Sequence, residues 1–247
     1  MFGIAICTYN RANHLDRLIL EIKEKTTGDY KLIVCDDGSV DSTPDVCNRH
    51  QVTRIGDSNR GIAWNKNRGL YALHEKLKCD WTVVIEDDMS VLDVNWNETW
   101  EKATMEYGHV NFLNDRDAED RRNRMISGTG TLADPFIATF VTGQCMFFSK
   151  ECLDTVGYLN PLFQGYGSEH IDYSKRCGRA GFGMKNGGYV HLKTGMEVLG
   201  IPPTADKGSI EKNAQISEEL KGKDIYVAPY RDEDQKAILE REVAGVI

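Results

Sequence analysis

Short apolar runs alternate with amphipathic segments over the first ninety residues. The runs have the length and the β-branched content of buried strands, and they lie at Phe2–Cys7, Lys31–Cys35, Thr53–Ile55 and Trp81–Ile85. The segments between them have helical spacing, which predicts helices over Arg11–Lys25, near Ser42–His50 and over Ile62–Leu77. Apolar strands that alternate with helices predict a parallel sheet covered on both faces.

Polar residues cluster directly after three of these predicted strands. The clusters are Thr8-Tyr9-Asn10, Asp36-Asp37-Gly38-Ser39 and Glu86-Asp87-Asp88. In open α/β sheets, ligands bind at the carboxyl ends of the strands. We therefore expect these three clusters to share one binding site.

The pattern changes after Asn95. It predicts a helix over Trp96–Tyr107, strands at Phe136–Val141 and Cys145–Phe148, a helix near Glu169–Ala180 and a strand that ends at His191, with a charged stretch at Asp115–Arg124. Residues 194–209 have little periodicity and are interpreted as a mobile loop. The tail from Ile210 is interpreted as two polar helices that are broken near Ala228-Pro229.

The composition is that of an ordinary globular protein. The chain has 247 residues, of which 40% are hydrophobic and 28% charged, and its net charge of −8 disfavours non-specific binding to nucleic acid or anionic membrane. No apolar run reaches the ~18 residues that a bilayer span needs, and the first residues do not have the pattern of a secretion signal. The seven cysteines are odd in number and include no Cys-x-x-Cys pair, so we expect a reducing cytoplasm rather than disulfides or zinc.

The three adjacent carboxylates of Glu86-Asp87-Asp88 indicate a cation site. Two such charges 4 Å apart repel by about 1 kcal/mol in water and about 4 kcal/mol in a partly buried cleft. A divalent cation such as Mg²⁺ or Mn²⁺ relieves this repulsion; the alternative is a solvated acidic loop. His191, at a strand end, is a candidate metal ligand, although a histidine there is more often structural.

Three other segments have both a functional and a structural interpretation. Asp36 and Asp37 end a buried strand, where a carboxylate needs a partner such as the ring N–H of a nucleobase, or else Asp37 to Ser42 form a turn and a helix cap. The basic, glycine-containing segment 59–69 suits a phosphate at a helix N-terminus, or is a solvated helix face. Segment 163–172 is a cluster for a catalytic base or an acceptor, or is a charged first turn of a helix.

In their order along the chain, these motifs resemble those of the family 2 glycosyltransferases, which have the GT-A fold. The matching segments are Cys7-Thr8-Tyr9-Asn10-Arg11, Val34–Ser39 with Asp41-Ser42-Thr43, Asn59-x-Gly61 to Asn67, Glu86-Asp87-Asp88, Thr142-Gly143 before Met146-Phe147-Phe148, and Gly165-Tyr166-Gly167-x-Glu169 leading to Asp172 and Arg176. The resemblance implies an α/β fold that is Rossmann-like, with a mainly parallel central sheet flanked by helices. It also implies a small acceptor-side sheet and a C-terminal helical tail.

The resemblance also implies an activity, in which a sugar moves from a nucleotide sugar, usually a UDP-sugar, to an acceptor hydroxyl with the help of Mn²⁺ or Mg²⁺. Residues 1–95 would form the nucleotide-sugar-binding half, residues 96–193 the acceptor-binding and catalytic half, and residues 194–247 a mobile loop with C-terminal helices. The implied nucleotide-sugar ligands are Thr8, Tyr9, Asn10, Arg11, Asp37, Asn59, Gly61, Lys66, Asp87 and Gly143. Asp88 and His191 would hold the metal, and Glu169, His170 and Asp172 would face the acceptor.

Two departures from the family pattern bear on the mechanism. Lys66 stands where many relatives have arginine, which keeps the charge but loses the bidentate fork. His170 stands where inverting relatives often have an aspartate base, and a glutamate followed by a non-acidic residue also resembles retaining enzymes. We favour Glu169 as the base because carboxylates serve this role in most relatives, with His170 as the alternative.

Lys193 or Lys207, in or beside the loop at 194–209, would approach the phosphates as that loop closes.

Other functions compete with this interpretation. A nucleotidyltransferase or a dinucleotide dehydrogenase needs a glycine-rich phosphate loop after the first strand, and CTYNRANH is not one. Two alternatives stay open: a glycosyltransferase that acts on a flipped nucleic-acid base, and a catalytically inactive protein that only binds sugar nucleotides.

Overall fold

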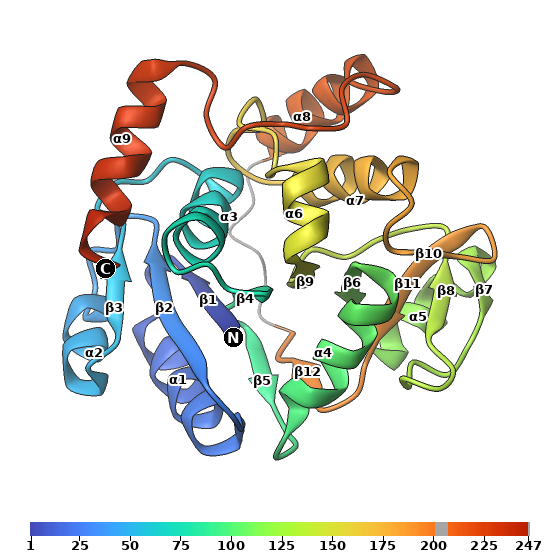
Figure 1. Cartoon of the computed structure of the whole chain (residues 1–247), viewed down its shortest axis with the longest axis horizontal. Helices are drawn as coiled ribbons and strands as arrows, with labels where there is room; N and C mark the ends of the chain where they lie inside the picture. The colour runs from blue at the N-terminus through green and yellow to red at the C-terminus, as the bar shows by residue number, and fades with distance from the viewer. Residues whose placement is uncertain (201–206, 247) are drawn as a thin grey trace.

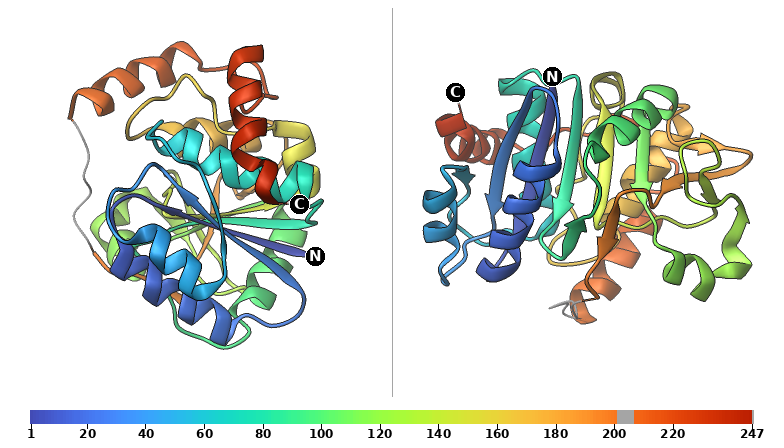
Figure 2. Two further views of the ribbon diagram at one scale, coloured as in Figure 1. Left: turned by 90° about the vertical axis from the view of Figure 1, so that its left-hand side faces the viewer. Right: turned by 90° about the horizontal axis from the view of Figure 1, so that it is seen from below.

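A central sheet with helices on both faces runs through the computed structural model, which describes residues 1–200 and 207–246 (Figures 1 and 2). Within the described part, the strand order is β3-β2-β1-β4-β9-β6-β11-β8-β7, with β10 paired to β11. Strands β8, β9 and β10 run opposite to the other strands of this sheet. The expected mainly parallel sheet flanked by helices is therefore confirmed.

The strands are short in the second half of the chain. They are β1 (Phe2–Thr8), β2 (Tyr30–Asp36), β3 (Thr53–Ile55), β4 (Trp81–Glu86), β5 (Met89–Val91), β6 (His109–Phe112), β7 (Met125–Ser127), β8 (Phe136–Ala138), β9 (Cys145–Ser149), β10 (Met184–Lys185), β11 (Gly188–Leu192) and β12 (Met196–Val198). Strands β5 and β12 form a separate two-stranded antiparallel sheet.

The helices pack on either side of the central sheet. They are α1 (Ala12–Lys25), α2 (Thr43–His50), α3 (Ile62–Tyr71), α4 (Trp96–Tyr107), α5 (Asp115–Asp120), α6 (Lys150–Val156), α7 (Glu169–Arg179), α8 (Lys207–Glu219) and α9 (Glu233–Val243), with shorter turns η1 (Ala72–Lys76), η2 (Arg122–Arg124) and η3 (Ala244–Val246). Seen from the side, α1 and α2 cover one face of the sheet, and α3 and α9 cover the other (Figure 2, left).

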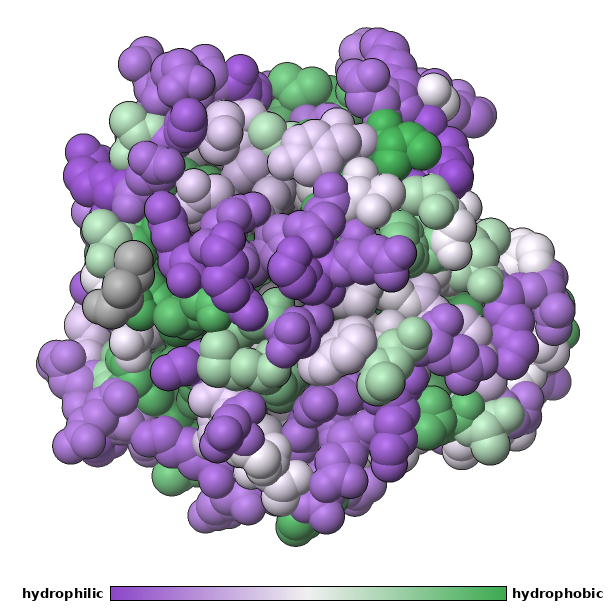
Figure 3. Space-filling model, in the orientation of Figure 1, coloured by the Kyte–Doolittle hydropathy of each residue, from purple (hydrophilic) through white to green (hydrophobic). Residues whose placement is uncertain are grey.

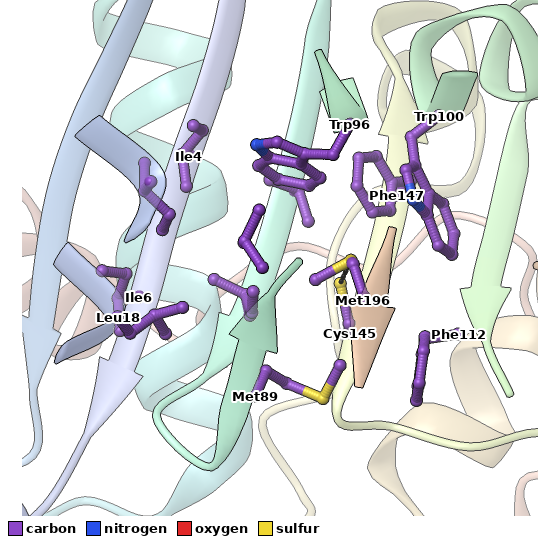
Figure 4. Packing of buried hydrophobic residues seen from close by; sticks show 14 of the residues in the cluster. Ile4, Ile6, Leu18, Met89, Trp96, Trp100, Phe112, Cys145, Phe147 and Met196 are labelled. Carbon is purple, nitrogen blue, oxygen red and sulfur yellow. Dashed lines mark hydrogen bonds between the residues drawn. The ribbon is translucent and has the colours of Figure 1, made fainter. Parts of the chain in front are cut away.

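The alternation of side chains along each strand divides the core into two layers. Ile4 and Ile6 belong to the layer under α1 and α4, whereas Ala5 belongs to the layer under α3. Aromatic rings fill the first layer, where Phe147 stacks on Trp100 with their ring centroids 4.4 Å apart (Figure 4). Because both faces of the strands are covered, β1 is buried along its whole length, and it is a rigid base for the loops that follow the strands.

Some predicted elements differ from the observed ones. The helix expected over Ile62–Leu77 is α-helical only to Tyr71 and continues as the π-helical turn η1. Within residues 194–209, expected to be a mobile loop, Met196–Val198 pair with β5, and Met196 packs on Cys145 of the core (Figure 4). A three-residue strand has no detectable periodicity, so the sequence could not reveal it. Residues 201–206 of that segment lie outside the described residues, as does the side chain of Lys207.

The surface in Figure 3 is mostly polar, with hydrophobic residues interspersed among the polar ones. Among the helices of residues 1–200 and 207–246, none has the length and apolar character that crossing a membrane requires. The C-terminal helical tail is present as α8 and α9, and α9 lies beside α3 (Figure 1).

Candidate functional site

A cavity of about 880 Å³ opens where β1, β2 and β4 end. The cavity therefore lies at the carboxyl edge of the parallel strands, where ligands of α/β sheets bind. Among the residues predicted for the site, those that line the cavity are Thr8, Tyr9, Arg11, Asp37, Asn59, Gly61, Asp87 and Asp88. The three polar clusters that follow separate strands are thus brought together in one place.

Asp87 and Asp88 are adjacent in sequence but have different environments. Asp87 accepts hydrogen bonds from the hydroxyl of Thr8 at 2.7 Å and from the guanidinium of Arg11 at 3.0 Å. The Oδ1 atom of Asp88 is buried and has no hydrogen-bond partner among the described residues. Burial, and then the negative charges of Glu86 and Asp87, raise the pKa of Asp88 to about 7. A buried carboxylate in this state has unused capacity to bind a cation.

Lys66 is buried beneath the cavity and does not line it. Its ammonium group lies 2.8 Å from Glu86 and 3.3 Å from Glu169, and it donates to the carbonyl oxygen of Gly143 at 2.8 Å. Neither Lys66 nor Gly143 lines the cavity, although both were expected to bind the nucleotide sugar. The ammonium group of Lys66 instead binds two carboxylates from other elements. Lys66 therefore ties α3, β4 and α7 together below the site.

Replacing Lys66 by methionine is expected to lower the free energy of unfolding by about 3–5 kcal/mol. The substitution keeps the side-chain length but leaves Glu86 and Glu169 without their shared cation. Urea unfolding measures the change. The exposed Lys78, which pairs with Glu75 at 3.2 Å on the surface, is the control, since Lys78→Met should cost less than about 1 kcal/mol. Equal stability of the two variants would contradict a structural role for Lys66.

Asp37 is held from three sides at the edge of the cavity. Its carboxylate accepts the backbone N–H groups of Arg60 at 2.8 Å and Gly61 at 3.0 Å, and the guanidinium of Arg68 at 3.0 Å. Gly61 has a φ of +89°, and a Cβ atom there would lie 2.8 Å from the backbone nitrogen of Gly165. Only glycine fits this position without strain, so the loop can bring its N–H groups onto Asp37.

Glu169, His170 and Asp172 begin α7 and have different partners. Glu169 is buried, and although burial opposes its ionisation, the charges of Lys66 and His170 hold its pKa well below the usual value. The Nδ1 atom of His170 lies 3.3 Å from Glu169, and the imidazole side chain is 20% exposed. These contacts form a carboxylate–histidine pair in which the carboxylate is also fixed by a lysine.

Asp172 points away from this pair. Its carboxylate accepts a hydrogen bond from Arg176 at 2.9 Å, one helical turn later. The same guanidinium donates to the backbone carbonyl oxygens of Val156 at 2.8 Å and Tyr158 at 2.6 Å. Asp172 does not line the cavity, and its contacts are those of a residue that joins α7 to the segment after α6.

Asn10 also lies outside the cavity lining. Its side chain accepts the backbone N–H of Val40 at 2.8 Å, and its own N–H donates to Ser39. It therefore joins the loop after β1 to the loop after β2.

His191 lies on β11 and is not among the residues that line the cavity. Its Nδ1 atom lies 3.0 Å from the carbonyl oxygen of Tyr189, and burial lowers its pKa to about 3. Strand register aligns His191 with Val84, across three strand spacings that amount to roughly 14 Å. The Nε2 atom of His191 is buried and has no hydrogen-bond partner among the described residues, as is the case for Oδ1 of Asp88. The described residues contain no group of three or more His, Cys, Asp or Glu arranged to hold a metal ion.

Residues of α5 and β12 form a wall of the cavity that the sequence did not predict. The additional lining residues include Asn114, Asp115, Arg116, Asp117, Asp120, Gln144, Tyr166, Glu197 and Ser209. Lys193, which was expected near the phosphates, also lines the wall, and its ammonium group binds both oxygens of Asp115 at 2.7 and 2.8 Å. The charged stretch around α5 was visible in the sequence, but nothing in it indicated that it would face the site.

Three kinds of comparison place the chain among known proteins. The sequence model of "Glycosyl transferase family 2" matches residues 3–157. No curated protein sequence matches the chain significantly. Many solved structures have a similar fold.

Three of these structures illustrate the similarity. GalNAc-T7 with UDP, GalNAc and Mn²⁺ has a TM-score of 0.64 at 13% identity, with 89% of this chain and 48% of that chain covered. A mannosyltransferase from Pyrobaculum calidifontis with GDP-Man and Mn²⁺ has a TM-score of 0.55 at 18% identity, with 82% and 55% covered. Glucosyl-3-phosphoglycerate synthase from Mycobacterium tuberculosis with Mn²⁺, UDP and glucosyl-3-phosphoglycerate has a TM-score of 0.52 at 16% identity, with 89% and 77% covered.

This chain spans about half the length of the first two proteins, and at these identities the likeness is one of fold. The family match is independent of them and covers more than half of the chain, from β1 to the end of α6. It includes all three polar clusters at the carboxyl ends of the strands. The chain belongs to glycosyl transferase family 2 and has the GT-A fold.

Proposed function

We propose that this protein transfers a sugar from a nucleoside diphosphate sugar, a UDP-sugar, to an acceptor hydroxyl with the help of a divalent metal ion. One observation carries the proposal: the cavity is lined both by Asp37, whose carboxylate is anchored, and by Asp88, whose buried Oδ1 atom has no partner among the described residues. In this assignment the first 95 residues bind the nucleotide sugar, and residues 96–193 supply the acceptor side.

Asp37 is the proposed ligand of the nucleobase. Its Oδ2 atom accepts one backbone N–H, so a lone pair remains for the ring N–H of uracil. Tyr9, which is 42% exposed, lines the same cavity and offers an aromatic face to the base. Asn59 and Gly61, on the loop that binds Asp37, border this part of the cavity.

Asp88 is the proposed metal ligand, and Mn²⁺ or Mg²⁺ fits its chemistry. Its buried, unpartnered oxygen and the neighbouring charges of Glu86 and Asp87 suit a hard divalent cation. When bound, such a cation neutralises charge on the leaving diphosphate. Mn²⁺ accompanies the nucleotide in the three similar structures described above. Asp87, fixed by Thr8 and Arg11, is then left to orient the ribose or the donor sugar.

His170 is the proposed general base, and Glu169 orients it. The oxygen of Glu169 that contacts His170 also contacts Lys66, which stabilises the ionised carboxylate and makes it a weak base. Contact through Nδ1 leaves Nε2 of His170 for the proton of the acceptor hydroxyl. The imidazole packs on Gly143, next to the cavity-lining Gln144.

The acceptor side of the cavity favours a neutral or cationic acceptor over nucleic acid. Asp115, Asp117 and Asp120 of α5 line it beside Arg116 and Lys193, and the acidic charges, which outnumber the basic ones on this wall, oppose a phosphate backbone. The Glu169–His170 pair favours an active enzyme over an inactive sugar-nucleotide binder.

All seven cysteines are free thiols, which supports the proposal of a reducing, cytoplasmic location.

Calorimetry of UDP with Mn²⁺ tests the proposed donor site. Asp37→Asn is expected to weaken UDP binding by about 1.5–3 kcal/mol, the range for a hydrogen bond to a charged group. The amide replaces an acceptor that the base and the Gly61 N–H both need. Asp57→Asn, on the loop after β3 that donates to Asp37 but exposed and outside the cavity lining, is the control and should bind UDP normally. If Asp37→Asn keeps full affinity for UDP, Asp37 is only a turn residue.

A further inference from the structure

The C-terminal helix α9 places a buried carboxylate behind the cavity. Glu242, whose side chain is 3% exposed, lies outside the segment that the family model matches. Its two oxygens accept hydrogen bonds from Nε and Nη2 of Arg68, both at 2.9 Å. This is the bidentate arrangement that fixes the plane of a guanidinium group. Glu242 also accepts the indole N–H of Trp64 at 2.9 Å.

The guanidinium group of Arg68 links Glu242 to Asp37. With Nε and Nη2 on Glu242, its Nη1 atom donates to Asp37 at 3.0 Å and to Asn65 at 3.0 Å. Nη2 also donates to the backbone carbonyl oxygen of Ser58 at 2.9 Å. A planar group held at both ends cannot rotate, so the direction of its bond to Asp37 depends on Glu242.

The loop that borders the cavity is tied to the same carboxylate. Nε of Arg60 lies 3.5 Å from Glu242, and the Arg60 guanidinium lies over the ring of Trp64, 5.5 Å from its centroid. The backbone N–H of Arg60 is in turn one of the donors to Asp37. Glu242 thus reaches Asp37 by two routes, through the side chain of Arg68 and through the loop.

We propose that Glu242 is a positioning residue for nucleotide binding, and that α9 is part of the donor site although it does not touch the ligand. The proposal rests on the proposed function, in which Asp37 binds the nucleobase. A carboxylate that only attached α9 to the fold would need one partner, whereas this one binds both Arg68, whose guanidinium donates to Asp37, and Arg60, whose backbone N–H does so. Glu242 therefore governs the affinity for the nucleotide rather than the chemical step.

The test compares Glu242→Gln with Glu240→Gln by calorimetry of UDP in the presence of Mn²⁺. The glutamine keeps the shape of Glu242 but loses the charge and one bond of the fork, so UDP affinity should fall about tenfold. Glu240, two residues earlier on α9, is exposed and contacts Tyr71 at 3.2 Å. Its variant should bind UDP as the wild type does. In donor kinetics, Glu242→Gln should raise KM and leave kcat unchanged.

A double-mutant cycle separates positioning from a general loss of stability. If Glu242 acts through Asp37, then Glu242→Gln should have little further effect on UDP affinity in the Asp37→Asn background. The same tenfold loss in both backgrounds overturns the proposal, and so does wild-type affinity in Glu242→Gln. If the wild type binds neither UDP nor GDP, both the proposed function and the role of Glu242 are wrong. If UDP binds and only the Glu242 result fails, the proposed function stands.

Discussion

Replacing Asp88 by asparagine is expected to lower kcat/KM about a thousandfold, and removing divalent metal with a chelator should abolish transfer. A metal ion at the leaving diphosphate contributes several kcal/mol to transition-state stabilisation, and each 1.4 kcal/mol is a factor of ten in rate. Asp88 provides the unpartnered buried oxygen of the cavity's carboxylate cluster. The measurements are initial rates with and without chelator, and calorimetry of Mn²⁺ binding.

The Asp88 variant should fold normally. Asparagine removes a buried charge that Glu86 and Asp87 repel, so thermal unfolding should occur at the same temperature or higher. Asp93→Asn, an exposed substitution five residues later, is the control and should keep its activity and its metal affinity. Full transfer activity of the wild type in excess chelator would remove the metal from the mechanism.

The first half of the fold could be predicted from the sequence because its signals are local. Strands β1, β2 and β4 are apolar runs of six or seven residues, and each is followed directly by polar residues. A parallel sheet requires the carboxyl ends of its strands to meet at one edge. Asp37, Asp87 and Asp88 therefore had to lie together, whatever the details of the loops.

The roles of Lys66 and Glu242 could not be predicted because they depend on distant pairing. Lys66 meets Glu169, which is 103 residues away, and Glu242 meets Arg68, which is 174 residues away. Both lysine and glutamate are usually exposed, and no local pattern marks the few that are buried. The position of His191 shows the same limit: its strand was predicted, but the order β4-β9-β6-β11, which places two strands between β4 and the strand of His191, was not.

His170→Asn is expected to lower kcat by about 10²–10⁴-fold while donor affinity stays unchanged. General-base catalysis contributes a factor of this size, and the asparagine removes the proton acceptor but keeps a polar side chain beside Glu169. The sequence favoured Glu169, but in the structure the contacting oxygen of Glu169 is shared between Lys66 and His170. A carboxylate held ionised in this way has little tendency to take a proton. Single-turnover rates with a true acceptor, beside UDP calorimetry, measure both quantities.

Glu169→Gln distinguishes the base from the residue that orients it. If His170 is the base, the glutamine variant still presents an oxygen to Nδ1, so its turnover should fall less than that of His170→Asn. It should also lose stability, because Lys66 then keeps only Glu86 as a charged partner. Asp172→Asn, whose partner Arg176 faces away from the cavity, should affect stability more than turnover. If Glu169→Gln loses most of its turnover while His170→Asn keeps nearly all of it, Glu169 is the base. The partly buried imidazole would then only support that carboxylate.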